Sequence, residues 1–206
     1  MDFDFDMMKT LFPQKKPVHK LKWGIPEARI SIPVQDPEAT VKDVRKQAFF
    51  SGGGQFVEEV HFKDYGNNVY AYYIIRTDKR TQDESAYFDG YMLQEEERLG
   101  VEVTNAFNFA KDLETMGYQY GFAREIEVWS FRALTRPITV FEITDFGNFM
   151  EIALPLTKVA GTREKDEKWL EAFLKKNKVD AQTIIPTDVL TLQLVSMLQQ
   201  QEPAKK

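Results

Sequence analysis

The sequence contains no cysteine and only two histidines among its 206 residues. Disulfides and thiolate metal sites are therefore excluded, and so is a zinc site built from histidine and cysteine. No apolar run approaches the roughly 18 residues that a membrane-spanning helix needs. The chain starts with the acidic segment Met1-Asp-Phe-Asp-Phe-Asp, where a signal peptide would be basic. These absences predict a cytoplasmic protein with no membrane partner.

The charge balance limits the class of partner further. The chain has 27 lysines and arginines against 32 aspartates and glutamates, a formal net charge of −5. Broad binding to a nucleic-acid backbone needs a clustered basic surface, so nucleic acid is disfavoured as a partner. The content of 43% hydrophobic residues, with 16 Phe and 8 Tyr, is typical of a packed globular protein. Because no pattern repeats, we expect one folded domain.

The two ends of the chain differ from its middle. Residues 1–25 show no apolar period, and Lys15, Lys16, Lys20 and Lys22 lie near Pro13 and Pro17, which predicts an extended arm. The basic cluster of this arm is either a solvated tail or a contact surface for an acidic protein partner. Residues 199–206 predict a polar tail. Residues 26–198 are then the folded domain.

Apolar residues that alternate with polar ones predict about eight strands. We expect these strands at residues 26–34, 56–65, 69–77, 86–94, 101–103, 120–132, 138–144 and 149–154. Helical spacing and cap residues predict helices at residues 37–49 and 105–117, and two more around residues 169–174 and 190–198. The run Gly52-Gly53-Gly54 predicts the turn that ends the first helix.

The order of these elements predicts the fold class. The helices lie between hairpins and do not follow every strand, which favours an α+β fold. About eight antiparallel strands tend to curl or close. We therefore expect a curved antiparallel sheet that closes toward a tunnel or barrel, with peripheral helices.

Four segments carry a recognisable pattern in a consistent order. They read Glu27-Ala-Arg-Ile-Ser-Ile-Pro-Val, then Ile74-Ile75-Arg76, then Ile138-Thr-Val-Phe-Glu142-Ile-Thr-Asp-Phe-Gly147-Asn-Phe-Met-Glu151-Ile-Ala-Leu, then Ile184-Ile185-Pro186-Thr187-Asp188-Val189-Leu190. Together they resemble the CYTH superfamily, the triphosphate-tunnel proteins that include class IV adenylyl cyclases and thiamine triphosphatases. The resemblance covers roughly residues 26–198.

The resemblance implies a ligand and a set of site residues. In the family, lysines and arginines inside a tunnel bind the phosphates of a nucleotide or polyphosphate, and glutamates hold a divalent metal, here Mg²⁺ or Mn²⁺. The resemblance implies phosphate contacts for Arg76, Arg124 and Arg132, and a guanidinium at Arg29, where the family has another residue, would also attract phosphate. They imply metal ligation for Glu27, Glu142 and Glu151. No catalytic residue is assigned.

Several positions depart from the family pattern. The first strand reads Glu27, Arg29 and Ser31 where the family has two acids and a lysine, and the last reads Glu151 and Ala153 where the family has two acids. A guanidinium in place of a carboxylate repels Mg²⁺ and attracts phosphate. Chemistry on a triphosphate needs metals and bases together. The pattern therefore predicts a degenerate active site with weak or absent phosphohydrolase or cyclase activity.

Two functions remain open at this point. The chain either binds a nucleotide or polyphosphate in a tunnel, or it is a non-catalytic interaction or structural module that reuses the fold. In the second case the glutamates and arginines pair with one another, because unpaired buried charges cost several kcal/mol each.

Strand parity gives an expectation that the structure can test. Alternate residues of a strand point to opposite faces of the sheet. On this basis Phe141, Ile143, Met150 and Ile152 should face helices on one side. The other side should receive five charged residues: Glu27, Arg29, Arg76, Glu142 and Glu151. Arg124 and Arg132 share one parity on their own strand.

Overall fold

The computed structural model describes residues 28–65, 70–90, 99–101, 106–154, 162–180, 183–185 and 187–201. The chain divides into two compact units. Unit 1 comprises Met1–Gly52 and Trp129–Val189, and unit 2 comprises Gly53–Val128 and Leu190–Lys206. The predicted arm, residues 1–25, lies outside the described residues, and so do residues 202–206 of the predicted tail.

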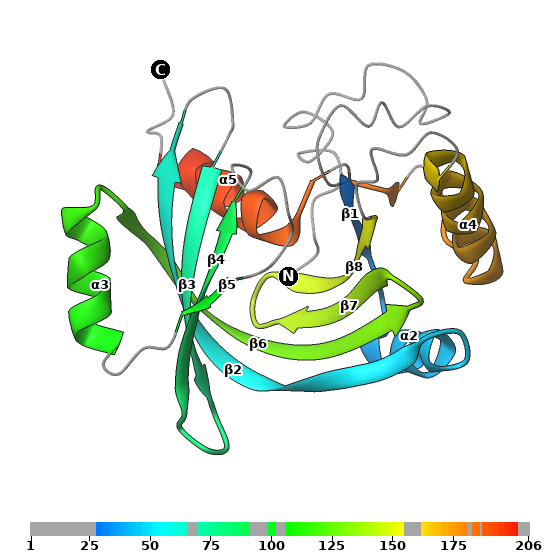
Figure 1. The fold of residues 1–206 in the computed structure, drawn as a ribbon, viewed down its shortest axis with the longest axis horizontal. Helices are drawn as coiled ribbons and strands as arrows, with labels where there is room; N and C mark the ends of the chain where they lie inside the picture. The colour runs from blue at the N-terminus through cyan, green and yellow to red at the C-terminus, as the bar shows by residue number, and fades with distance from the viewer. Residues whose placement is uncertain are drawn as a thin grey trace. The chain divides into compact units, whose positions relative to one another are not determined.

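One antiparallel sheet of eight strands is the framework of the fold (Figure 1). Its hydrogen-bonded order is β1-β8-β7-β6-β2-β3-β4-β5. The strands are β1 (Ala28–Pro33), β2 (Phe49–Asp64), β3 (Tyr70–Asp78), β4 (Glu84–Gly90), β5 (Leu99–Val101), β6 (Gln119–Ala133), β7 (Arg136–Ile143) and β8 (Gly147–Leu154). The order has two ends, so hydrogen bonds between the described residues do not close the sheet into a barrel.

Four helices accompany the sheet in the described part of the chain. They are α2 (Pro37–Arg45), α3 (Ala106–Thr115), α4 (Thr162–Lys176) and α5 (Val189–Gln201). Helix α2 starts where the sequence predicts, because the Asp36 side chain accepts a hydrogen bond from the N–H of Ala39 at 2.9 Å and Pro37 opens the helix. None of the described helices is long and apolar enough to cross a membrane. The α+β class with peripheral helices is confirmed.

The glycine run after α2 is a strand and not a turn. Gly52, Gly53 and Gly54 lie inside β2, a strand of 16 residues. The prediction of a turn at this run was wrong. Glycine weakens a strand locally, but pairing with a neighbouring strand decides whether the strand forms.

The core of unit 1 lies between one face of its strands and two helices. Alternate residues of β1, β7 and β8 meet there with Val41 and Val44 of α2 and with Leu170 and Phe173 of α4. The strand residues in this core include Ile30, Ile32, Ile138, Val140, Met150 and Ile152. Met150 and Ile152 therefore face helices, as the sequence predicts.

The register of β7 against β8 corrects one expectation. Glu142 lies opposite Asn148, and Glu151 lies opposite Thr139. Residues opposite one another in an antiparallel pair share a face, so Glu142 and Glu151 are on opposite faces of the sheet. The prediction that both project to the same side was wrong, and so was the placement of Phe141 and Ile143 away from Glu151.

The connection between these two strands explains the error. Ile143 already pairs with Gly147, which leaves a loop of three residues, Thr144 to Phe146. Asp145 in this loop has a φ of 60°, the left-handed conformation that three-residue hairpin loops use. The sequence prediction places Gly147 and Asn148 in the loop, which would pair Glu142 with Glu151. The actual pairing of Glu142 with Asn148 puts each side chain of β7 on the face opposite to the predicted one.

In unit 2 the sheet is covered on both faces. One face packs against α5, whose Leu190 and Leu194 join a cluster that includes Val60, Ile74 and Phe122. The opposite face packs against α3, where Leu113 contacts Ala71 and Tyr118. In Figure 1 α3 and α5 accordingly lie on either side of β3. The predicted hairpin of β2 and β3 is confirmed by their antiparallel pairing.

His61 lies on the α3 face of β2 and is buried. The residue is 3% exposed, and neither ring nitrogen has a hydrogen-bond partner among the described residues. The ring of Tyr120 meets it edge-on at 5.7 Å between centroids. Burial lowers the pKa of His61, and the charges of Glu59 and Glu114 oppose this only in part. The folded protein therefore favours the neutral imidazole.

We predict that His61 makes the protein sensitive to mild acid. Above the ordinary histidine pKa of 6.5 the imidazole is neutral in both states, so it adds no pH dependence. Below this pH the unfolded chain binds a proton that the folded chain resists, so the free energy of unfolding falls. His61→Phe should reduce this fall in denaturant titrations between pH 8 and mildly acidic pH.

The other histidine supplies the control. His19→Gln should leave the acid-dependent fall in place if His61 is its source. Equal pH dependence in His61→Phe and the unmodified protein would contradict the prediction.

Candidate functional site

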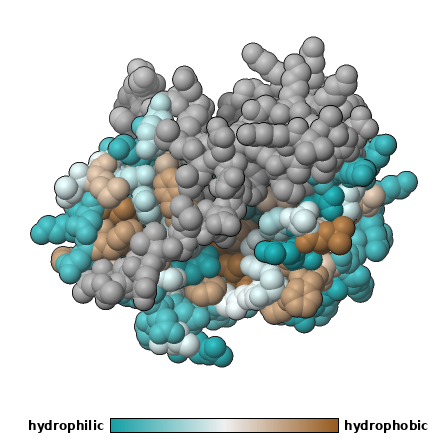
Figure 2. Space-filling model, in the orientation of Figure 1, coloured by the Kyte–Doolittle hydropathy of each residue, from teal (hydrophilic) through white to brown (hydrophobic). Residues whose placement is uncertain are grey.

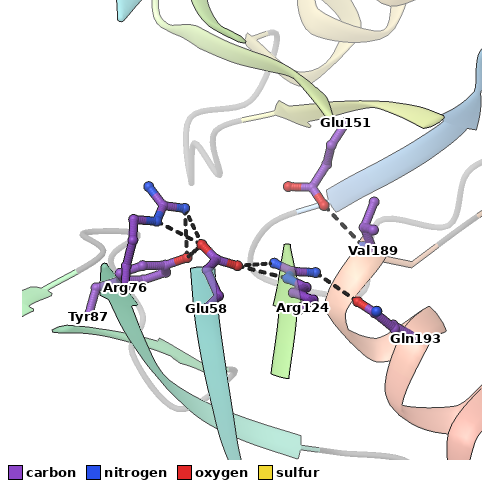
Figure 3. A network of polar contacts seen from close by, with 7 residues as sticks. All are labelled: Glu58, Arg76, Tyr87, Arg124, Glu151, Val189 and Gln193. Carbon is purple, nitrogen blue, oxygen red and sulfur yellow. Dashed lines mark hydrogen bonds and ion pairs between the residues drawn. The ribbon is translucent and has the colours of Figure 1, made fainter. Parts of the chain in front are cut away.

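A buried group of charged residues lies on the α5 face of unit 2. Arg124 of β6, Glu58 of β2 and Arg76 of β3 come from three neighbouring strands. Glu58 lies directly opposite Arg76. On its strand each charged residue occupies the parity of buried apolar side chains such as Val60 and Phe122, so all three point into the core of unit 2. Figure 3 shows them meeting at the carboxylate.

Glu58 is completely buried, and both of its carboxylate oxygens are used. Oε1 accepts hydrogen bonds from Nε of Arg76 at 2.7 Å, from Nη2 of Arg76 and from the hydroxyl of Tyr87 at 2.8 Å. Oε2 accepts from Nε of Arg124 at 2.7 Å and from Nη2 of Arg124 at 2.5 Å. Each guanidinium thus donates two hydrogen bonds to one oxygen of the carboxylate, and such charge-assisted hydrogen bonds are stronger than those between neutral groups.

Two further residues complete this group. Nη1 of Arg124 donates to the side-chain oxygen of Gln193 on α5 at 3.0 Å. Nη2 of Arg76 donates to the hydroxyl of Tyr87 at 3.0 Å. We refer to Glu58, Arg76, Tyr87, Arg124 and Gln193 as the Glu58 cluster. It links three strands to β4 and to the first turns of α5.

The two arginines differ in their surroundings. Arg124 is buried, and each of its three guanidinium nitrogens donates a hydrogen bond. The side chain of Arg76 is 19% exposed, and its guanidinium carbon lies 4.4 Å from the ring centroid of Phe56 and 5.0 Å from that of Tyr87. Among the described residues none accepts a hydrogen bond from Nη1 of Arg76. Arg76 is therefore the more exposed of the two arginines.

The charges of the cluster do not cancel. Burial raises the pKa of Glu58, but the charges of Arg124 and Arg76 outweigh it and lower that pKa to about 2. Burial also lowers the pKa of Arg76, and Tyr87 and Glu58 outweigh it, so the net shift is upward. At neutral pH one negative and two positive charges are thus present, which leaves one excess positive charge.

Two residues of the Glu58 cluster are among the site residues predicted from the sequence. Arg76 and Arg124 were predicted as phosphate ligands, and the structure brings them together. Glu58 was missed because no motif marks it. The alternation of β2 nevertheless places Glu58 on the same buried face as Val60 and Phe62. A buried acid requires a cationic partner, so this pattern indicates a buried ion pair.

Arg132 and Arg29 belong to unit 1. The Arg132 side chain is exposed, while Phe131 and Ala133 beside it enter the core of unit 1. Arg29 lies on β1 opposite Ala153, and its side chain is outside what the structure describes. A role for either residue in phosphate binding stays a prediction.

Glu151 holds the start of α5. Its side chain is buried, and Oε2 accepts a hydrogen bond from the backbone N–H of Val189 at 3.1 Å (Figure 3). Ser31, opposite Glu151 on β1, donates through its hydroxyl to the carbonyl of Thr187 at 2.6 Å. A carboxylate at a helix N-terminus is favoured both by this hydrogen bond and by the helix dipole. Glu151 thus caps the first backbone N–H of α5.

The predicted metal ligands do not converge in the described part of the chain. Glu142 is exposed and on the opposite face from Glu151, and Glu27 lies outside the described residues. Among the described residues, no group of three His, Asp or Glu side chains could hold a metal ion. The described carboxylates thus do not fit a shared site for Mg²⁺ or Mn²⁺.

We predict that removing one partner from the Glu58 cluster strongly destabilises the protein. Arg124→Met leaves Oε2 of Glu58 buried without a donor, so the free energy of unfolding should fall by at least about 2 kcal/mol. The stabilisation from Glu58 is present above its ordinary pKa of 4.5 and is lost as the pH falls toward about 2. In Arg124→Met this acid loss should begin at higher pH. Urea unfolding at several pH values measures both effects.

The exposed Arg132 on the same strand is the matched control. Arg132→Met should change the free energy of unfolding by less than about 0.5 kcal/mol. Similar losses for both substitutions would contradict a special role for Arg124.

We also predict opposite outcomes for two of the proposed metal ligands. Glu151→Ala removes the acceptor for the N–H of Val189 and should cost about 1–2 kcal/mol. Glu142→Ala, at an exposed position, should cost less than about 0.5 kcal/mol. Thermal unfolding without added metal measures both. A larger loss for Glu142→Ala than for Glu151→Ala would show that the assignment is reversed.

Comparison with known proteins shows which solved structures share this fold. The sequence matches none of the protein-family models and none of the curated proteins. A conserved hypothetical protein from Pyrococcus furiosus matches in structure with a TM-score of 0.60 and 14% identity, over 82% of this chain and 99% of that one. A protein from Pyrococcus horikoshii matches with a TM-score of 0.59 and 17% identity, over 82% of this chain and 99% of that one.

A third solved structure carries a functional description. A protein from Vibrio parahaemolyticus described as a "putative adenylate cyclase" matches with a TM-score of 0.59 and 16% identity, over 84% of this chain and 99% of that one. At such identities the likeness establishes the fold. The chain therefore has the fold of these three proteins.

Proposed function

We propose that the chain binds a nucleotide or another polyphosphate, with weak or absent phosphohydrolase or cyclase activity. The excess positive charge of the Glu58 cluster carries this proposal. Two guanidiniums share one carboxylate, so a buried site holds more positive than negative charge. An excess buried charge is costly without a counter-anion. Phosphate oxygens match the forked donors of arginine.

Arg76 is the contact group of this proposal. Its guanidinium is held by Glu58 and Tyr87 and lies beside the rings of Phe56 and Tyr87, so its direction is fixed before a ligand arrives. Its Nη1 donates to no described acceptor. A preorganised donor binds an anion with a smaller loss of side-chain freedom than a mobile lysine would.

The proposed weak or absent catalysis is supported by the positions of the described carboxylates, which are not close together. Two-metal chemistry on a triphosphate needs several carboxylates close together. In this chain Glu142 faces away from Glu151, and Arg29 and Ala153, where the family pattern has acids, lie directly opposite each other. We therefore propose anion binding that depends little on Mg²⁺ or Mn²⁺. ATP is one ligand to test because the Vibrio parahaemolyticus protein of the same fold is described as a cyclase.

A second function is favoured by a different observation. All three guanidinium nitrogens of Arg124 and both oxygens of Glu58 are satisfied within the chain, as a purely structural cluster requires. Large apolar side chains are also exposed: Phe49 and Leu134 in unit 1, and Phe107 and Tyr120 in unit 2. Figure 2 shows hydrophobic side chains among hydrophilic ones on the face that it draws. The alternative is a non-catalytic interaction or structural module with a protein partner.

Calorimetry distinguishes the two functions. We expect ATP and inorganic triphosphate to bind the unmodified protein, with affinity that changes less than about threefold when Mg²⁺ is added. Arg76→Gln removes the proposed contact and should weaken binding at least about tenfold. Turnover of either ligand should be absent or very slow.

Arg132→Gln is the control, because that exposed arginine lies in unit 1. Binding lost in Arg76→Gln and kept in Arg132→Gln supports the assignment of Arg76. The absence of any polyphosphate binding by the unmodified protein favours the structural module. Robust Mg²⁺-dependent hydrolysis or cyclisation would contradict the proposed lack of catalysis.

A further inference from the structure

The carboxylate of Glu58 occupies the donors that would otherwise hold a phosphate. Nε and Nη2 of Arg76 point at Oε1, and Nε and Nη2 of Arg124 point at Oε2. These side-on edges are the ones with which arginine binds phosphate oxygens bidentately. Glu58 therefore takes the place of an anionic ligand between two arginines.

We propose that Glu58 is an internal counter-anion that limits the site to one phosphate group of its ligand, contacted through Arg76. This inference rests on the proposed function and specifies the charge class of the ligand that the site accepts. An external phosphate has to compete with a carboxylate that is tethered to β2 and is therefore always present at high local concentration.

The geometry of the two arginines supports this limit. Arg124 is buried and donates through all three guanidinium nitrogens, so it has little to offer a second phosphate. Arg76 keeps 19% of its side chain exposed and has an Nη1 without a described acceptor. One excess positive charge balances one negative charge, whereas the full charge of a triphosphate would need further cations.

Glu58 has a neighbour on β2, Glu59, with the same side chain but on the other face of the sheet. Glu58 lies opposite Arg76 in the register of β2 and β3, and it is fully buried. Its neighbour Glu59 lies opposite Ile75 on the other face and is exposed. Substitutions of Glu58 and Glu59 can therefore be compared directly, because the two glutamates differ in the face they occupy and in burial but not in chemistry.

Glu58→Gln is the decisive variant because it removes the charge and nearly keeps the shape. Calorimetry with inorganic triphosphate should show affinity at least about tenfold higher than in the unmodified protein, since both arginines become available. The dependence of affinity on salt should also become steeper, because one more cation is uncompensated. Glu59→Gln should leave both quantities unchanged.

A folded Glu58→Gln protein that binds triphosphate no more tightly than the unmodified protein would overturn the inference, because Glu58 would then only position the arginines. If the unmodified protein binds triphosphate and this variant does not bind it better, the proposed function stands and the inference fails. If only the variant binds, the inference stands and the proposed function fails.

Loss of Glu58 also destabilises the fold, so a second measurement uses stability itself. Inorganic phosphate in excess should raise the unfolding temperature of Glu58→Gln by several degrees more than that of the unmodified protein, because the free anion replaces the missing carboxylate. Glu59→Gln should respond like the unmodified protein. Equal shifts in all three proteins, or no refolding of Glu58→Gln in phosphate, would contradict an anion-binding role for the vacated position.

Discussion

The shared carboxylate of Glu58 is the interaction on which unit 2 depends. A fully buried acid is tolerated only because two guanidiniums and a tyrosine hydroxyl surround it, and in return it fixes β2, β3, β4 and β6 relative to one another. Through Gln193 the same group reaches α5. Buried ion pairs add less net stability than their Coulomb energy suggests, because desolvation offsets the attraction. What such a cluster provides is a fixed geometry for the strands that contribute to it.

The charged residues singled out in the sequence differ in how far their hydrogen bonds are used within the chain. Arg124 and Glu58 form their hydrogen bonds in the interior, whereas Nη1 of Arg76 donates to no acceptor among the described residues. Glu151, where a metal ligand was expected, is committed to the first N–H of α5. Some charged residues that the sequence suggests as ligand contacts, such as Arg124 and Glu151, thus form hydrogen bonds that hold strands and a helix in place. Fold likeness alone therefore does not establish activity.

Much of the fold could be predicted from the sequence because its signals are local. Asp36-Pro37 fixes the start of α2, and alternation fixes most strands. The register of β7 against β8 could not be predicted, because it depends on the left-handed residue Asp145 and a loop one residue shorter than expected. Arg76 and Arg124 were recognised by family resemblance. Glu58 was missed because its partners are distant in sequence, and only strand pairing brings them together.

The division of the chain into units has a consequence for how the protein unfolds. The chain passes between units after Gly52, Val128 and Val189, and these points lie inside β2, inside β6 and at the first residue of α5. No boundary falls in an exposed linker, so a protease finds no loop there at which to separate the halves. Melting one half would break the same strands that the other half uses. The two units should therefore lose their structure together, as a single cooperative species with two cores.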